Sequence, residues 1–248
     1  MFCRSRDSRC WRVYQTSGQV GAGGRGGPVS RPREPVSALD ATTAIDIIFG
    51  GCRDEALIAF GSRRPLANGD ISPHYMFALQ VGDRRQWLPA VLEHQLDQTQ
   101  YIMQNTLSTN ALHRWNRRDQ RYSVEESHQA IRAGKPRYFA ASNRYVHDLA
   151  AVVVDLDAYR VGLEPWDAFA VVGNRCSAGE LPWPSLVALS GRGAYLWWLL
   201  TSKDGRPPLA TPDNAALWEL TARTLVQCTG DLGADPNAPG VGKETYGK

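Results

Sequence analysis

The sequence predicts an α+β fold that follows a disordered tail. Beyond about residue 38, segments with apolar residues at helical spacing alternate with short segments of extended type, and Gly or Pro separates many of them. A length of 248 residues with 43% hydrophobic residues suffices for one large globular domain or two small ones. We therefore expect a tail over residues 1–38 and a folded domain over residues 39–248.

The tail prediction depends on the composition of the first 38 residues. The stretch GQVGAGGRGGPVSRPREP is rich in Gly, Arg and Pro and has no hydrophobic periodicity. Such a segment buries too little apolar surface to offset the entropy that is lost on ordering. Its arginines could contact nucleic acid. An extension without a function, a misassigned start codon and a transit peptide are the alternatives.

Composition excludes several classes of protein. No apolar run is long enough for a transmembrane helix, and the first residues lack the apolar centre of a secretory signal. The five cysteines are odd in number and form no CxxC pair, which favours free thiols in a reducing, cytoplasmic compartment. The five histidines lie far apart and show no zinc pattern. A net charge of +3 permits an anionic partner without requiring one.

The first elements of the domain carry recognisable start signals. Asp40 is placed to cap a helix in SALDATTAIDIIFG, and two strands, EALIAFGS and HYMFALQV, follow it. The apolar residues of RRQWLPAVLEHQLDQ have nearly helical spacing, but Pro89 predicts that this helix begins only at about that residue.

A strand and a capped helix are expected next. TQYIMQNTLS is the strand candidate. In SVEESHQAIRAG, Ser123 can cap a helix with Glu126 three residues on, and Gly134 can end it.

Two aspartates end the apolar run AAVVVDLDAYR. Because strand side chains alternate between faces, Asp155 and Asp157 should point the same way, while the valines and Leu156 fill the core. Like charges this close raise each other's pKa unless a cation is present, and Mg²⁺ or Mn²⁺ prefers carboxylate oxygens. Two such ions would suit phosphoryl transfer. The alternatives are exposed aspartates at a strand end, one capping the next turn, or the DxD motif of a sugar-nucleotide transferase.

The second motif is SGRG, which joins two strand-like segments in PSLVALSGRGAYLWWLL. Small residues let the backbone approach a ligand and leave its N–H groups able to bind anions. Arg192 adds a planar guanidinium suited to phosphate oxygens. The alternative is an ordinary hairpin with Arg192 directed into water.

The last helix is expected over TPDNAALWELTARTLVQC. Thr211 is its cap and Pro212 stands at its first position. An apolar set fits a helix that covers one face of the sheet. The set comprises Ala216, Leu217, Leu220 and Val226. This helix leads to Asp235 in LGADPNA.

These motifs, VVVDLDAYR, PSLVALSGRGAYLWWLL and LGADPNA, resemble in this order the catalytic core of the archaeo-eukaryotic primase superfamily. The likeness covers roughly residues 98–238 and is greatest to the primase or primase-polymerase domains in replication proteins of bacterial plasmids and phages. It implies an RRM-like primase-polymerase core with an N-terminal α/β module. It also implies nucleotidyltransferase activity and two bound Mg²⁺ or Mn²⁺ ions.

The resemblance implies a role for each motif. The catalytic metal ligands would be Asp155, Asp157 and Asp235. The phosphates of the incoming NTP or dNTP would be held by Ser190, Gly191, Arg192, Gly193 and Tyr195.

Two features depart from the family pattern. Tyr195 stands where many members have histidine, and because tyrosine supplies no cation, phosphate binding would depend on Arg192 and other basic residues. Similar replication proteins continue past the third aspartate with an arginine-rich stretch and a Pro-Gly turn, whereas this chain ends in APGVGKETYGK. We therefore expect a truncated or divergent C-terminus. Its glycines are not a Walker loop, because the first glycine is missing and Glu244 follows the lysine.

A basic stretch, HRWNRRDQRY, is the candidate contact for a single-stranded DNA template. Interleaved aromatic and basic residues suit single strands, and a solvated basic loop is the alternative. Its arginines are Arg114, Arg117, Arg118 and Arg121. The chain shows no helicase-like ATPase, so an unwinding partner would be a separate chain or part of a missing C-terminal segment.

Three functional hypotheses follow. The first is a DNA primase or primase-polymerase of plasmid- or phage-type replication, which joins NTPs or dNTPs on a DNA template. The second is a catalytically degenerate, DNA-binding module of a replication initiator. A sugar-nucleotide transferase is third, because it would leave Asp235 and the SGRG turn without a role.

Overall fold

The computed structural model describes residues 12–15, 38–65, 71–95, 101–114, 117–135, 137, 143–189, 192–236 and 244–246. In this part of the chain the protein has a mixed α+β fold with antiparallel sheets. The helices are α1 (Ala41–Phe49), α2 (Arg84–Gln95), α3 (Val124–Arg132), α4 (Pro165–Ser177) and α5 (Pro212–Cys228). Short 3-10 helices are η1 (Thr109–Ala111), η2 (Asn143–Tyr145), η3 (Ala158–Val161) and η4 (Gly230–Leu232).

The strands form three sheets. The large sheet has the order β2–β1–β9–β10–β8, which are Ala38–Leu39, Arg12–Gln15, Leu186–Leu189, Ala194–Leu199 and Ala151–Leu156. The second sheet has the order β11–β5–β3–β4, which are Glu244–Tyr246, Tyr101–Met103, Leu57–Pro65 and Ile71–Gln80. The third is the pair β6 (His113–Arg114) and β7 (Arg117–Arg121).

The C-terminal half follows a regular connection order. From β8 the chain runs through α4, the hairpin β9–β10 and α5, and then returns to pair Ala234 with Leu156 in antiparallel fashion. Strand β8 therefore lies between β10 and this returning segment. Its end is the point where three distant parts of the sequence meet.

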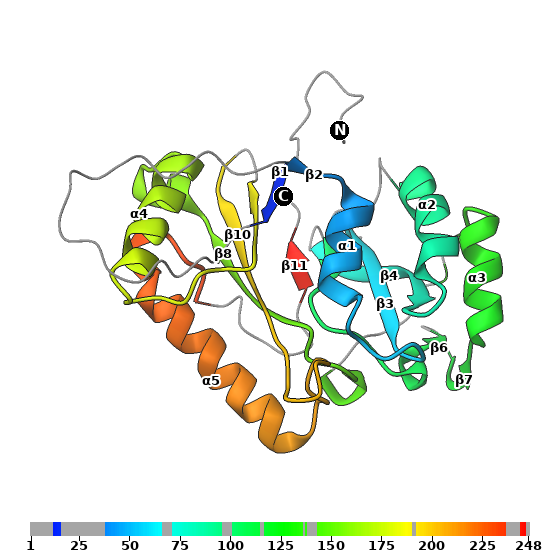
Figure 1. Ribbon diagram of the computed structural model, residues 1–248. Helices are drawn as coiled ribbons and strands as arrows, with labels where there is room; N and C mark the ends of the chain where they lie inside the picture. The colour runs from blue at the N-terminus through cyan, green and yellow to red at the C-terminus, as the bar shows by residue number, and fades with distance from the viewer. Residues whose placement is uncertain are drawn as a thin grey trace.

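Strand β8 is buried on both faces. Val152, Val154 and Leu156 join the core cluster that contains the inward residues of α4 and α5. Ala151 and Val153, on the other face, join a cluster that contains α1, α2 and parts of β3 and β4. Figure 1 shows this arrangement, with α4 and α5 on one side of β8 and β10, and α1, α2 and α3 at the opposite end of the molecule.

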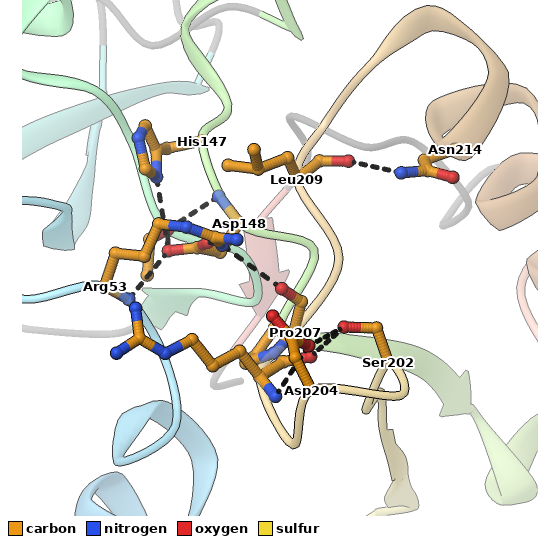
Figure 2. Close-up of polar contacts among 10 residues, drawn as sticks. Arg53, His147, Asp148, Ser202, Asp204, Pro207, Leu209 and Asn214 are labelled. Atoms are coloured by element: carbon orange, nitrogen blue, oxygen red, sulfur yellow. Dashed lines mark hydrogen bonds and ion pairs between the residues drawn. The ribbon is translucent and has the colours of Figure 1, made fainter.

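A buried ion pair connects these two parts of the fold. Asp148, three residues before β8, has a fully buried side chain and pairs with Arg53, which precedes β3. The hydroxyl of Thr106 also donates to Asp148, at 3.1 Å, and Arg53 donates to the Pro207 carbonyl at 3.2 Å. Figure 2 shows Asp148 at the centre of these contacts, with His147 beside it. A buried carboxylate is tolerated here because several donors surround it.

The expected caps are confirmed. The carboxylate of Asp40 accepts the Thr43 amide at 2.9 Å, and the Thr211 hydroxyl accepts the Asn214 amide at 3.3 Å. Ser123 and Glu126 form the full reciprocal capping box. The strands expected around residues 55–62 and 74–81 are also present, as β3 and β4.

Two expectations about helices were wrong. Helix α2 begins at Arg84 rather than near Pro89, which lies inside it. Proline removes one hydrogen bond to the preceding turn, but burial of Trp87 and Leu88 and the pairing of Arg84 with Asp46 at 2.5 Å stabilise that turn. In α5, Val226 is buried as expected, but Leu217 and Leu220 are each 62% exposed. The buried residues are Trp218, Ala222, Leu225 and Val226.

The tail predicted over residues 1–38 falls mostly outside the described residues. Within it, Arg12–Gln15 forms β1 and pairs with β9 of the large sheet. These four residues are therefore ordered as a strand, which differs from the prediction. The ending APGVGKETYGK is described only at Glu244–Tyr246, where β11 pairs with β5.

Candidate active site at the end of strand β8

Both predicted aspartates are buried where β8 ends. Asp155 lies within the strand and is 8% exposed, and Asp157 follows the last strand residue and is 4% exposed. The backbone turns at Asp157 (φ −79°, ψ 61°) to begin η3. The prediction that Asp155 and Asp157 share a face needs both residues in the strand, but β8 ends at Leu156. Asp157 makes no side-chain capping bond there. The alternative of two exposed aspartates at a strand end therefore does not describe this structure.

The SGRG motif reaches the aspartates through Gly193. Residues Ala194 and Tyr195 pair with Leu156 and Asp155 across the antiparallel β8–β10 ladder. A Cβ atom on Gly193 would lie 1.9 Å from the Leu156 carbonyl oxygen, a distance that no side chain can occupy. Only glycine allows the backbone to pass this close. Ser190 and Gly191 lie outside the described residues.

The LGADP motif reaches the same point from the other side. The amide of Asp157 donates to the Gly233 carbonyl at 2.9 Å, and the amide of Asp235 donates to the Asp155 carbonyl at 3.0 Å. Gly233 has a φ of +85°, and a Cβ there would lie 2.6 Å from the Asp157 carbonyl oxygen. The backbone of Asp235 is therefore held directly beside Asp155.

Tyr195 lies inside β10 rather than in the turn. It is 2% exposed and belongs to the same core cluster as Val153 and Trp197. Its register opposite Asp155 puts the two residues on neighbouring strands at one level of the sheet. A direct contact of Tyr195 with a nucleotide stays a prediction.

Two residues that the sequence argument missed complete the charge pattern. Arg160 pairs with the Asp157 carboxylate at 2.8 Å, and its Nε donates to the Tyr159 hydroxyl at 3.3 Å. The Tyr159 hydrogen bond and the charge of Asp157, with a smaller effect of Asp235, raise the pKa of Arg160. DLDAYR gives this signal only where a helical turn follows the strand directly, because a residue three positions after an aspartate then lies beside it.

The donor chemistry of the acid pair fits a hard divalent cation. Two buried carboxylates supply oxygen ligands, and Mg²⁺ is commonly held by one or two carboxylates with waters and substrate phosphates completing the shell. The three aspartates expected as metal ligands, Asp155, Asp157 and Asp235, do not form a three-ligand group in the described part of the chain. Within the described ranges, no three His, Cys, Asp or Glu side chains are close enough to hold a metal ion. Asp155 and Asp157 are therefore the candidate ligands, and the backbone of Asp235 lies beside Asp155.

The basic stretch forms the two-stranded hairpin β6–β7 rather than a loop. Arg121 is exposed and donates to the side chain of Asn110. The side chains of Arg114, Arg117 and Arg118 lie outside the described residues. Contact of this hairpin with DNA stays a prediction.

The cysteines whose side chains are described carry free thiols. Cys52 and Cys176 are buried and Cys228 is exposed. Burial, with the nearby charge of Asp148, raises the pKa of Cys52 to about 12.

None of the helices described here combines the length and the apolar character that a membrane crossing requires. Comparison of the chain with protein-family models, curated proteins and solved structures found no match.

Proposed function

We propose that this chain is a template-directed nucleotidyltransferase, a primase or primase-polymerase of the kind found in plasmid and phage replication proteins. One observation carries the proposal: the motifs around Asp155, Gly193 and Gly233 meet at the end of β8. A sugar-nucleotide transferase with a DxD motif gives no reason for this convergence.

The connection order supports the proposal further. An RRM-like core has the order β-α-β-β-α-β, with its first strand between the third and the fourth. The chain from β8 to Ala234 follows this order, with the fourth strand reduced to one antiparallel pairing. We infer an RRM-like catalytic core that begins at β8, with the segments before it as the N-terminal module.

In the proposed mechanism, the protein positions its reactants and supplies charge. Asp155 and Asp157 would hold the divalent cations, Mg²⁺ or Mn²⁺, and Asp235 would join them after a side-chain rearrangement. When bound, these ions would stabilise the attacking 3′-oxygen and the pyrophosphate leaving group. Arg192 and the amides of the turn would bind the triphosphate. The close backbone contacts at both glycines fix these groups relative to one another.

The partners follow from this chemistry. The substrates would be NTPs or dNTPs and a single-stranded DNA template, with the β6–β7 hairpin as a candidate template contact. A helicase would be a separate partner, and the cytoplasm the compartment.

The proposal is tested by primer synthesis on single-stranded DNA with labelled NTPs or dNTPs and Mn²⁺ or Mg²⁺. We expect metal-dependent products from the native chain and none from the Asp155→Ala/Asp157→Ala variant. Products that persist in the variant would contradict the assigned site. The matched control is Asp213→Ala, which removes an exposed aspartate in the first turn of α5.

A DNA-binding module of a replication initiator is the second candidate. The ion pair between Arg160 and Asp157 favours it, because an arginine there could permanently replace a cation. This second candidate predicts that the native chain and the Asp155→Ala/Asp157→Ala variant both bind the template and that neither makes primer products.

A further inference from the structure

We propose that Tyr159, Arg160 and Arg192 form a phosphate clamp in which Arg160 alternates between Asp157 and the phosphates of a bound nucleotide. The inference rests on the proposed function. It adds two residues to the nucleotide site and predicts that cation binding and nucleotide binding are coupled through Arg160.

The two arginines are held around one exposed aromatic ring. Tyr159 is 43% exposed, and the guanidinium carbons of Arg192 and Arg160 lie 5.1 and 5.9 Å from the centroid of its ring. Cations within about 6 Å of a ring face are attracted to it. Both guanidinium groups therefore lie beside one ring, where the phosphates of a bound nucleotide would contact both.

Arg192 is fixed through its backbone and available through its side chain. Its carbonyl accepts the Tyr159 amide at 3.2 Å, and the next residue, Gly193, passes directly against Leu156. The side chain is exposed, and no carboxylate among the described residues forms an ion pair with it. A guanidinium in this position can form paired hydrogen bonds with phosphate oxygens.

Arg160 differs from Arg192 because its guanidinium already pairs with a carboxylate, that of Asp157. Its guanidinium pairs with Asp157 at 2.8 Å, while about half of the Arg160 side chain is exposed and the Asp157 side chain is almost fully buried. The exposed arginine is the member of this pair that can move. A divalent cation at Asp157 would repel the guanidinium and take over its role as the counter-ion.

The displaced guanidinium would stay beside the Tyr159 ring, which Arg192 also contacts. A nucleoside triphosphate carries several negative charges, and the released Arg160 would add a second guanidinium for them. By linkage, a cation that frees Arg160 strengthens nucleotide binding, and the nucleotide strengthens cation binding by the same factor. The ligand class is a polyphosphate-bearing nucleotide.

The first experiment measures Mn²⁺ binding without nucleotide, by electron paramagnetic resonance of free Mn²⁺. We expect Arg160→Gln to bind Mn²⁺ about fivefold more tightly than the native chain, because the competing charge is gone. Arg160→Lys should stay near the native affinity. Arg223→Gln is the control, since it removes an exposed arginine of α5 whose nearest carboxylate is 4.0 Å away.

The second experiment measures binding of labelled ATP at saturating Mn²⁺ by equilibrium dialysis. We expect Arg160→Gln to weaken ATP binding about tenfold, as expected for loss of one charged hydrogen bond. The two effects of one substitution are therefore opposite in sign. Thermal unfolding of each variant checks that it is folded.

The outcomes separate the clamp from the function itself. If Arg160→Gln leaves both affinities at the native values, or changes them in the same direction, the clamp is overturned even though the function can stand. If Mn²⁺ binding is unchanged in Asp155→Asn/Asp157→Asn, the proposed function fails at its metal site.

Discussion

Substitution of Gly233 by alanine tests whether close backbone packing holds the LGADP motif against the end of β8. The new Cβ would lie 2.6 Å from the Asp157 carbonyl oxygen, while ordinary contact begins at 3.4 Å, so the backbones must separate by about 0.8 Å. Overpacking of this size costs about 2 kcal/mol. The positive φ of +85° adds about 1 kcal/mol of strain in alanine. We expect the free energy of unfolding to fall by about 3 kcal/mol in total.

Gly162 supplies the matched control. It has a φ of +72°, but a Cβ on Gly162 meets no atom within 4 Å. Gly162→Ala should therefore show only the strain of about 1 kcal/mol, and the difference between the variants measures the contact with Asp157. The assay is urea denaturation followed by tryptophan fluorescence.

The same pair of variants should differ in activity. A shift of about 1 Å at a catalytic group costs about 100-fold in rate, so folded Gly233→Ala should extend primers about 100-fold more slowly than Gly162→Ala. Equal stability and equal activity of the two variants would refute the argument that Gly233 positions the site.

Two further predictions concern the part of the fold that supports this site. Asp148→Asn should lower the free energy of unfolding by about 3 kcal/mol, because it leaves the charge of Arg53 without its buried partner. Urea denaturation measures this loss, and a change below about 1 kcal/mol would contradict the prediction. Of the thiols described, Cys228 should react with iodoacetamide first in the folded protein, because it is exposed. Cys52 should stay unmodified, because it is buried and burial raises its pKa to about 12. Mass spectrometry of tryptic peptides measures the order of modification, and earlier reaction of Cys52 would contradict the prediction.

The secondary structure was predictable wherever local signals decide it. The cap at Ser123 and the glycine after α3 act within a few residues, so the sequence alone indicates them. Pro89 was misleading because the proline rule weighs one lost hydrogen bond and leaves out the tertiary burial of Trp87 and Leu88, which decides where α2 begins. Long-range packing overrides local propensity at such points.

The rotation of α5 was not predictable from hydrophobicity alone. Leu217 and Trp218 are adjacent apolar residues, and only one of them can face the sheet. The indole of Trp218 donates to the Ala151 carbonyl at 2.8 Å, which fixes the rotation and leaves Leu217 exposed. A hydrogen bond to a strand 67 residues away leaves no periodic signal in the sequence.

The sequence indicated the motifs of the candidate site but not the charged residue Arg160 that pairs with Asp157. Both aspartates are buried at the end of β8 and Gly193 passes directly against Leu156, but the strand ends before Asp157, so the shared face of the two aspartates stays a prediction. The pairing of Arg160 with Asp157 depends on a 3-10 turn that follows β8 directly, and the sequence predicted no such turn. The sequence also does not reveal that the backbone of Asp235 is held against Asp155, or that among the described residues the three aspartates do not form a three-ligand metal group.

We expect a divalent cation to bind at the end of β8, where the three motifs meet. Iron-directed cleavage tests it most directly: Fe²⁺ replaces Mg²⁺, ascorbate and peroxide generate radicals at the bound metal, and mass spectrometry maps the cuts. We expect cuts near Asp157, Gly193 and Asp235 that excess Mg²⁺ suppresses and that are lost in Asp155→Asn/Asp157→Asn. Cuts elsewhere, or cuts that Mg²⁺ does not suppress, would contradict it.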